Sequence, residues 1–406
     1  MDKNHRFFKK HAHTLRYSFV HGSYWMAFGA SYNFVTVYLL AKSFTSYEIG
    51  IIMALTNVFS AILQPLAASF SEDNKKPTLS SMTLTLIFAS ATLSGLLFFA
   101  KNTFWPTAFL YFMLLTVMLT IHPLLNSLGM KPISQGVPIN FGFSRGMGSL
   151  SYAAMSYILG ALVDAQGTSV LPFSFLTLFL LTNLSTLWFV RKLPPPPKEE
   201  PDDPHFPKTT LSTWGFMSTY KRFTLYLLGL IFLFICFNLI NIYMIKIIEN
   251  VGGSEKHMGS AFAIAAIVEL PFMLGFSSLL KRFKVTTLLK ISGLVFTLKA
   301  VITYFSVSIP MIYFAQSLQM FSYALFIPGS IYYVSSVIHP RHMVRGQAFT
   351  TSATTFGAVF GSLIGGLLLS FTSLEVMLIT GVILSTVGTL LLFLAVEDPN
   401  QPLNLS

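Results

Sequence analysis

The stretch Met258–Leu280, MGSAFAIAAIVELPFMLGFSSLL, is an apolar run with a single formally charged residue, Glu269, in its segment IVELPF (267–272). An α-helix needs about 20 apolar residues to cross a bilayer, so this run is long enough to span one. A carboxylate near the bilayer centre costs about 2.5–3.5 kcal/mol on insertion scales. Whether the run crosses a membrane therefore decides what Glu269 can do.

The composition of the whole chain indicates a polytopic membrane protein. Of its 406 residues, 53% are hydrophobic and only 10% are charged, whereas soluble domains carry about 25% charged residues. So few charges could not cover the surface of a soluble protein of this length. The apolar runs predict an all-α integral membrane protein in a lipid bilayer, with twelve transmembrane helices at residues 17–41, 47–70, 78–100, 105–129, 142–164, 168–190, 222–247, 258–280, 286–307, 310–334, 346–369 and 374–396.

The positions of the basic residues predict the orientation of the chain. The formal net charge is +11, but Lys and Arg cluster between the apolar runs, which favours a topology signal over nucleic-acid binding. With the N-terminus inside, the outer loops keep only Lys42, Lys101 and Lys256, with Lys246 near the outer end of its span. We therefore expect both termini in the cytoplasm and the protein in the bacterial cytoplasmic (inner) membrane. The single cysteine, Cys236, excludes an intrachain disulfide.

Residues 192–215, KLPPPPKEEPDDPHFPKTTLSTWG, divide the chain into two halves. The segment is Pro-rich and charged, and it cannot bury enough apolar surface to fold. We predict an N-terminal six-helix bundle (1–191), a cytoplasmic linker (192–215), a C-terminal six-helix bundle (216–397) and a cytoplasmic tail (398–406). Six spans on each side of a linker are typical of internally duplicated transporters, which bind substrate between their halves.

Three charged residues are candidates for a functional site inside the spans. Glu269 is expected to face an aqueous cavity or a cation; a fixed ion pair between two helices is the structural alternative. Lys299, in the middle of the ninth span, is the candidate cationic partner unless it snorkels to the interface. Arg145 either binds a polar ligand or is an ordinary basic flank of the fifth span.

Uncharged polar residues inside the spans form a second group of candidates. Asn238 and Asn241 lie three residues apart, on one face of the seventh span. Such amides bind the hydroxyl groups of a ligand or join neighbouring helices. Tyr152, seven residues after Arg145, is placed to stack on a ring-shaped ligand. The same two interpretations apply to Gln316, Gln319 and Ser322 in the tenth span. His122, close to Asn126 in the fourth span, is either a packed polar residue or a proton carrier.

No motif for enzymatic or ATP-driven chemistry is found. The sequence lacks a P-loop, a dinucleotide fingerprint, metal-spaced Cys and His residues and a serine-hydrolase elbow. We therefore expect no enzyme activity, no cofactor and no metal. A sensor or integral-membrane enzyme is the alternative class, and it usually needs several clustered acids or histidines where this chain has one mid-span acid.

Five segments resemble the major facilitator superfamily, and within it the lactose permease type of oligosaccharide/proton symporter. They are GIIMALTNVFSAILQPL (50–66), HPLLN (122–126), NFGFSRGMGSLSYA (140–153), IVELPF (267–272) and SLQMFSYALF (317–326). The resemblance implies the major facilitator fold, with two six-helix bundles around a central cavity. It also implies that Arg145 and Glu269 are the sugar-binding arginine and glutamate, and that Tyr152 replaces the stacking tryptophan. Asn126 stands where that family has a glutamate, and Lys299 where it has an arginine.

The chain departs from that family at its buried charges. The family's two charge pairs are replaced here by neutral pairs, Asn238 with Thr354 and Asn241 with Gln316. Replacing both partners leaves no buried charge without a partner, whereas removing only one partner of a buried pair destabilises a protein by about 3–5 kcal/mol. Gln319 and Ser322 occupy the positions of a histidine and a proton-carrying glutamate, so the family's proton mechanism does not transfer directly.

Together these features predict a secondary transporter that works by alternating access as a monomer. The substrate is expected to be a small hydroxylated solute such as a sugar or an oligosaccharide; a nucleoside, an aromatic metabolite or a drug are the alternatives. Burial disfavours a charged carboxylate and a nearby cation favours it, so Glu269 could load and release a proton in symport; the alternative is a uniporter. The expected substrate-binding residues are His122, Asn126, Arg145, Tyr152, Asn238, Asn241, Glu269, Lys299 and Gln319.

Overall fold

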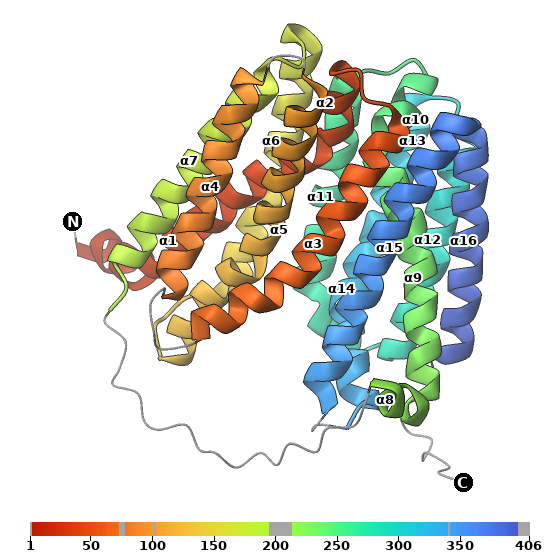
Figure 1. The fold of residues 1–406 in the computed structure, drawn as a ribbon. Coiled ribbons are helices and arrows are strands. Elements are labelled where there is room, and N and C mark those ends of the chain that lie inside the picture. The colour runs from red at the N-terminus through yellow and green to blue at the C-terminus, as the bar shows by residue number, and fades with distance from the viewer. Residues whose placement is uncertain (1, 73–77, 101–102, 195–212, 340–341, 397–406) are drawn as a thin grey trace.

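The computed structural model describes residues 2–72, 78–100, 103–194, 213–339 and 342–396, and within these ranges it contains helices and no strand. Two groups of helices lie side by side (Figure 1). The N-terminal group comprises α1 (Asp2–Asn33), α2 (Val35–Ala41), α3 (Ser46–Glu72), α4 (Leu79–Phe99), α5 (Phe104–Ser134), α6 (Phe141–Gln166) and α7 (Val170–Arg191). The C-terminal group comprises α8 (Thr213–Thr219), α9 (Lys221–Ile242), α10 (Met244–Asn250), α11 (Glu255–Leu280), α12 (Val285–Tyr304), α13 (Ile309–Ser317), the short 3₁₀ helix η1 (Leu318–Met320), α14 (Tyr323–Val337), α15 (Met343–Phe371) and α16 (Leu374–Ala395).

The prediction of an all-α membrane protein is confirmed, with three of the twelve expected spans interrupted. Among the described residues, ten helices are long and apolar enough to cross a bilayer. The span expected at 17–41 is divided into α1 and α2 at Phe34, the span at 222–247 into α9 and α10 at Tyr243, and the span at 310–334 into α13, η1 and α14. Irregular backbone at membrane depth is tolerated only where protein or a water-filled cavity surrounds it. The three interruptions are therefore expected to lie inside the bundle.

The predicted linker and tail fall largely outside the described ranges. Of residues 192–215, the structure describes 192–194 and 213–215, and the last three belong to α8. The tail predicted at 398–406 lies entirely outside them.

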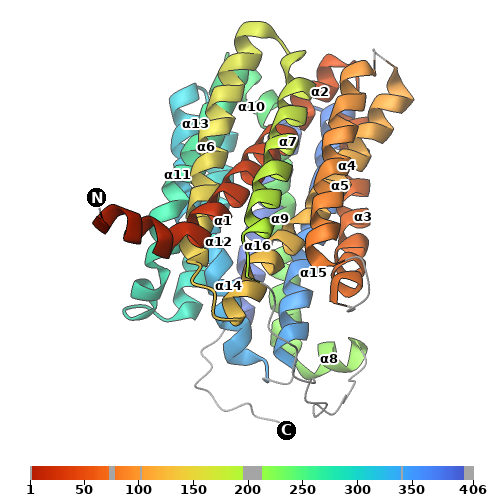
Figure 2. The ribbon, with the colours of Figure 1, turned by 90° about the vertical axis from the view of Figure 1, so that its left-hand side faces the viewer.

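The two groups repeat one packing pattern. In the N-terminal group α1 packs on α6 and α7, and in the C-terminal group α9 packs on α15 and α16. Each of these first helices ends at an aromatic residue, Phe34 or Tyr243, and continues as a short helix, α2 or α10. Figure 2 shows α7 at the front of the N-terminal group, with α1 behind it. This shared arrangement is what an internal duplication produces.

Tyrosine hydroxyls fix α1 against α5. Tyr17 and Tyr24 on α1 donate hydrogen bonds to the carbonyl oxygens of Leu125 and Met118, at 2.9 and 3.0 Å. Tyr111 on α5 donates in return to the carbonyl of Ser31, at 2.8 Å. A buried phenol needs such a partner because hydrocarbon supplies none. These bonds hold the segment of α1 between Tyr17 and Ser31 in a defined register.

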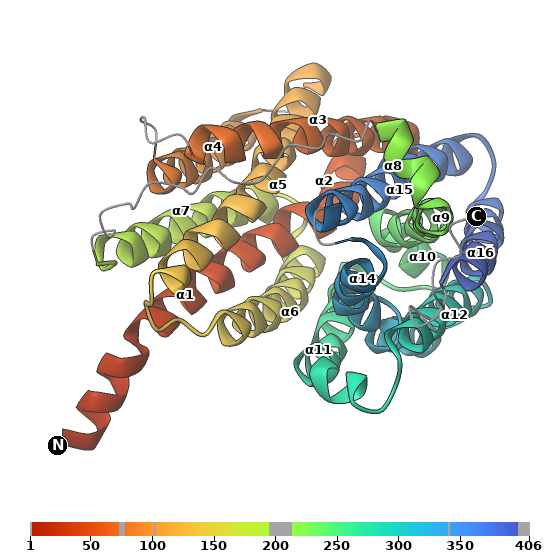
Figure 3. The same cartoon turned by 90° about the horizontal axis from the view of Figure 1, so that it is seen from below.

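The two groups touch at the end of the molecule that carries α2 and α10. There α6 crosses α11 without room for a side chain, because a Cβ built on Gly160 would lie 2.7 Å from the carbonyl oxygen of Glu255 and 3.0 Å from Cα of Gly259. On the other side α3 meets α15, and the Tyr243 hydroxyl donates to the carbonyls of Ser46 and Ser362, at 3.2 and 2.9 Å. Figure 3 shows both crossings from below.

The groups separate toward the opposite end, where α7 ends and α8 begins. Every position of α3 from Ala61 to Leu66 is exposed except the half-buried Gln64. A Cβ built on Gly275 of α11 would have no neighbour within 4 Å. Within the described ranges, the hydrogen bonds that join the groups all lie toward the α2/α10 end. The space between the groups is therefore closed at one end and open at the other.

Candidate functional site

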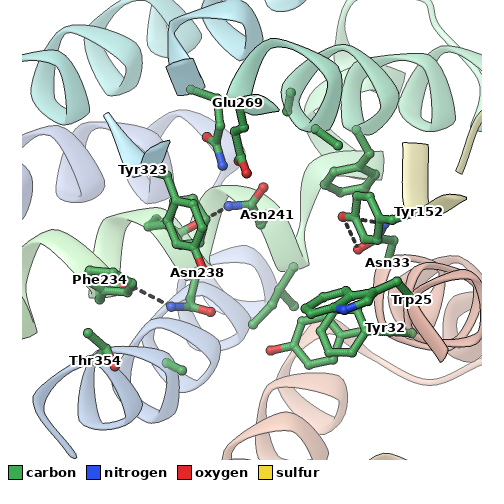
Figure 4. A pocket seen from close by; sticks show the side chains of 18 of the residues that line it. Trp25, Tyr32, Asn33, Tyr152, Phe234, Asn238, Asn241, Glu269, Tyr323 and Thr354 are labelled. Atoms are coloured by element: carbon green, nitrogen blue, oxygen red, sulfur yellow. Dashed lines mark hydrogen bonds between the residues drawn. The ribbon is translucent and has the colours of Figure 1, made fainter. Parts of the chain in front are cut away.

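A cavity of about 380 Å³ lies between the two groups of helices (Figure 4). Pockets for small ligands commonly measure about 300–1,000 Å³. The N-terminal group contributes Trp25, Phe28, Tyr32, Asn33, Asn57, Leu119, Arg145, Ser149 and Tyr152 to its wall. The C-terminal group contributes Phe234, Phe237, Asn238, Asn241, Ile242, Phe262, Ala265, Ala266, Glu269, Gln319, Tyr323, Thr354, Thr355 and Ala358.

The structure brings most of the predicted site residues together at this cavity. Those that line it are Arg145, Tyr152, Asn238, Asn241, Glu269 and Gln319. Lys299, His122 and Asn126 are not part of its wall. Lys299 lies behind Gln319, and the other two pack behind the aromatic side chains of α1.

Arg145 lies against Trp25. The centre of its guanidinium is 4.2 Å from the centroid of the indole ring, and one terminal nitrogen donates to Ser149 Oγ at 3.1 Å. Gly148 makes room for the ring, because a Cβ there would lie 2.6 Å from Cδ1 of Trp25. A cation over an indole face gains about 0.5–2 kcal/mol depending on its desolvation. The stacking orients the planar donors of Arg145 at the cavity wall.

The aromatic wall on α1 was not predicted from the sequence. Trp25, Phe28 and Tyr32 all line the cavity, and the rings of Phe28 and Tyr32 stack at 5.0 Å between centroids. Across the cavity, Tyr323 stacks on Phe237 at 5.2 Å. The spacing i, i+3 and i+7 along α1 is the one signal that places three rings on one helical face.

Tyr152 is held by Asn33. Its hydroxyl donates to Oδ1 of Asn33 at 3.0 Å and accepts from Nδ2 at 2.8 Å, while Nδ2 also reaches Ser156 Oγ at 3.2 Å. Asn33 is the last residue of α1 before the interruption at Phe34. The ring is therefore fixed on the cavity wall between α1 and α6, with its polar end already satisfied.

The amides of α9 present hydrogen-bond acceptors to the cavity. Asn238 Nδ2 donates to the carbonyl of Phe234 at 2.8 Å, and Asn241 Nδ2 donates to that of Phe237 at 2.7 Å (Figure 4). These bonds to the preceding turn fix both amides, and the Oδ1 atoms remain as acceptors. No hydrogen bond links Asn238 to Thr354 among the described residues, although both line the cavity.

Glu269 faces the same cavity from α11. Its carboxylate interacts with the Gln319 side chain, and the cations Arg145 and Lys299 are near enough to act on it electrostatically. Within the described ranges, the one ion pair is Lys246–Glu249 at the molecule's surface. Glu269 therefore lies near one amide and two cations, without a direct salt bridge to either cation.

Lys299 lies outside the cavity wall, on α12. Its side chain is 3% exposed, and Nζ donates to Oε1 of Gln316 at 2.9 Å and to Oε1 of Gln319 at 2.5 Å. A lysine buried this deeply has not snorkelled to an interface. Its hydrogen bond to Gln319 connects it to a residue of the cavity wall.

His122 and Asn126 support the aromatic wall from behind. The His122 ring stacks on Tyr24 at 6.1 Å and meets Trp25 edge-on at 5.3 Å. Its Nε2 lies 3.5 Å from Nδ2 of Asn126. In this conformation both residues pack against other side chains, and their binding of substrate stays a prediction.

A family model described as "MFS_1 like family" matches residues 14–379. The chain belongs to the MFS_1 like family. It is 27% identical over 376 residues to a maltose permease of Geobacillus stearothermophilus, covering 91% of each chain. It is 25% identical over 401 residues to the uncharacterized transporter YwbF of Bacillus subtilis (strain 168), covering 95% of each.

The fold is also found among solved structures. The crystal structure of a mutant of the nucleoside transporter NupG superposes with a TM-score of 0.79, covering 95% of this chain and 100% of that one at 14% identity. That identity establishes a shared fold and says nothing of a shared substrate. Membership of the MFS_1 like family and this fold identify the protein as a multi-pass membrane transporter of the major facilitator type.

Proposed function

We propose that this transporter carries a small hydroxylated solute, a sugar or an oligosaccharide, by alternating access. The observation that supports this most is the pairing of Arg145 from α6 with Glu269 from α11 around one cavity. An arginine donates hydrogen bonds to sugar hydroxyls and a carboxylate accepts them. Because the two residues belong to different groups of helices, a sugar bound to both would bridge the halves that must move.

The rest of the cavity wall fits the same class of substrate. Asn238 and Asn241 offer acceptors, while Trp25, Tyr152 and Tyr323 offer ring faces. Sugars combine hydroxyls at the ring edge with apolar C–H groups on the ring face, so mixed polar and aromatic walls suit them. The similarity to a maltose permease supports a sugar over a nucleoside.

The conformation corresponds to one stage of a transport cycle. If the basic loops are cytoplasmic, the open end of the cavity faces the cytoplasm and the crossings of α6 with α11 and α3 with α15 seal the outer side. Transport then requires those outer contacts to part as the halves close at the cytoplasmic end. A single chain contains the whole cavity, so we propose that the monomer is the transporting unit.

Glu269 is the proposed proton carrier. Burial of a carboxyl group disfavours its charged form, and a nearby cation favours it; Arg145 lines the same cavity as Glu269. A change in the distance to Arg145, which belongs to the other half, would alter this balance during the cycle and couple proton movement to sugar movement. If Glu269 only binds substrate, the protein is a uniporter.

A substrate panel tests the proposed function. Purified protein in liposomes would be given radiolabelled maltose, lactose, uridine and phenylalanine, each with and without an inward proton gradient. We expect saturable uptake of maltose that a proton gradient accelerates. Uptake of uridine or phenylalanine in place of either sugar would contradict the sugar assignment, and uptake indifferent to the gradient would favour a uniporter.

Tyr152 should contribute through its ring more than through its hydroxyl. Because Asn33 already satisfies the hydroxyl, Tyr152→Phe is expected to raise the KM for maltose by about threefold or less. Tyr152→Leu removes the stacking face and should raise the KM by about tenfold. Equal effects of the two variants on initial uptake rates would show that the hydroxyl is the binding group.

A further inference from the structure

Lys299 is a buried cation whose partners are both glutamine oxygens. Its Nζ donates to Oε1 of Gln316 at 2.9 Å and to Oε1 of Gln319 at 2.5 Å, and it lies 5.8 Å from the Phe237 ring centroid. An ammonium has three donors and no acceptor. Each glutamine must therefore turn its carbonyl oxygen toward Lys299, so the two hydrogen bonds from Nζ fix the orientation of both side-chain amides.

The orientation of the Gln319 amide decides which of its groups can bond at the cavity. With Oε1 committed to Lys299, the NH₂ group is what Gln319 offers to other partners. The carboxylate of Glu269 lines the same cavity as the Gln319 side chain and lies near it, and an ionised carboxylate only accepts. The NH₂ group is therefore the part of Gln319 that can donate to Glu269, which would give a chain of one polarity from the ammonium through the amide to the carboxylate.

The two glutamines that bond Lys299 lie at the interruption of the tenth span. Gln319 belongs to η1, and Gln316 to the last turn of α13 just before it. Side chains three residues apart lie on one face of an α-helix and eclipse one another in a 3₁₀ helix. Both amide oxygens therefore meet the same ammonium, while Gln319 also lines the cavity.

We infer that Lys299 is a positioning residue, which orients the amide of Gln319 so that it donates to Glu269 and holds this carboxylate ready to accept from the substrate. The inference rests on the proposed role of Glu269 in the cavity and adds how that role is maintained. Lys299 itself need not touch the substrate, because it is not part of the cavity wall.

Other groups also face Glu269, and they must be held constant in a test. Arg145 and Tyr152 approach from α6 and Tyr323 from α14. None of them is bonded to Lys299 or Gln319 among the described hydrogen bonds. A double-mutant cycle on Lys299 and Gln319 therefore isolates the proposed connection from these neighbours.

The test uses a readout that requires no substrate. A hydrophobic carbodiimide reacts with a carboxyl group in its protonated form, and peptide mass spectrometry gives the labelled fraction of Glu269 in the full-length protein at neutral pH. Exposed Glu249 serves as the internal reference. Lys299→Met and Gln319→Leu should each speed labelling of Glu269 by about tenfold, since each removes a charge-assisted interaction that favours the ionised form.

The cycle distinguishes positioning from independent effects. If Lys299 acts through Gln319, the Lys299→Met/Gln319→Leu double variant labels no faster than the quicker single variant. Lys299→Arg, which keeps charge and donors, should label within about twofold of the parent. Gln316→Leu is the matched control, because Gln316 also bonds Lys299 but does not line the cavity; it should likewise remain within about twofold.

Two results would overturn the inference. One is a double variant that labels at the product of the two single effects; the other is a Gln316→Leu variant as fast as Gln319→Leu. If Lys299→Met does not fold, Lys299→Gln replaces it, because glutamine keeps a hydrogen-bond donor without the charge. Its rate of Glu269 labelling is expected to lie between those of the parent and Gln319→Leu. A rate equal to that of Gln319→Leu would contradict the proposal that Lys299 orients the amide. Maltose uptake is scored separately, so a parent that labels as expected but transports no sugar contradicts only the proposed function.

Discussion

Replacing Glu269 by glutamine is expected to abolish accumulation of maltose against its gradient. The amide has nearly the same shape but cannot carry a proton or a charge, so the driving force is lost. Initial uptake driven by a proton gradient should fall by about 100-fold, because hydrogen bonds to a charged group are worth about 1.5–3 kcal/mol and coupling is lost in addition. The measurement is radiolabelled maltose uptake into liposomes, with internal pH followed by a trapped dye.

Counterflow separates coupling from binding in that variant. Exchange of internal for external maltose needs no net proton movement, so Glu269→Gln should retain counterflow at high sugar concentration. Glu249→Gln is the control, since Glu249 pairs with Lys246 at the surface. Sugar-driven alkalinisation outside the liposomes that persists in Glu269→Gln would remove this residue from the coupling role.

Replacing Gly259 by leucine is expected to prevent closure of the outer side. A Cβ on Gly259 would overlap the carbonyl oxygen of Ser156 and lie 3.0 Å from Cα of Gly160, and backbone atoms cannot move aside as a side chain can. Overpacking of this kind costs about 1–3 kcal/mol, which shifts a two-state equilibrium by about fivefold to about 150-fold toward the outward-open form. Maltose uptake should fall accordingly.

The same helix offers a matched control for that prediction. Gly275 lies on α11 toward the open end, where a Cβ meets nothing within 4 Å, so Gly275→Leu should transport like the parent. A cavity thiol, Thr355→Cys in a Cys236→Ser background, reports the conformation. An impermeant thiol reagent applied outside should label it faster in Gly259→Leu only; equal labelling in both variants would show that this crossing is not the outer seal.

The polar part of the site could be predicted from the sequence because burying a polar group in an apolar span is costly. Glu269, Arg145 and Asn238 each stand out for that reason, and all three line the cavity. The aromatic part could not be predicted in the same way. Trp25 and Tyr32 are uncharged, and a chain with 40 Phe and 16 Tyr gives no sign of which rings face a cavity.

The interruptions in three spans depend on tertiary contacts. Phe34, Tyr243 and Ser322 are not helix breakers, and the nearest proline of the tenth span, Pro328, lies inside α14. Which end of the cavity is open is also beyond the sequence, because the two conformations share every residue and differ by a few kcal/mol at most.

Labelling of the Thr355→Cys thiol from each side of sealed, oriented vesicles tests alternating access most directly. Alternating access around a sugar site predicts that impermeant thiol reagents reach this position from the inside and from the outside in turn, and that maltose slows labelling from both sides while uridine does not. Labelling from one side only, or at rates indifferent to maltose, would contradict a sugar-binding cavity exposed alternately to the two faces of the membrane.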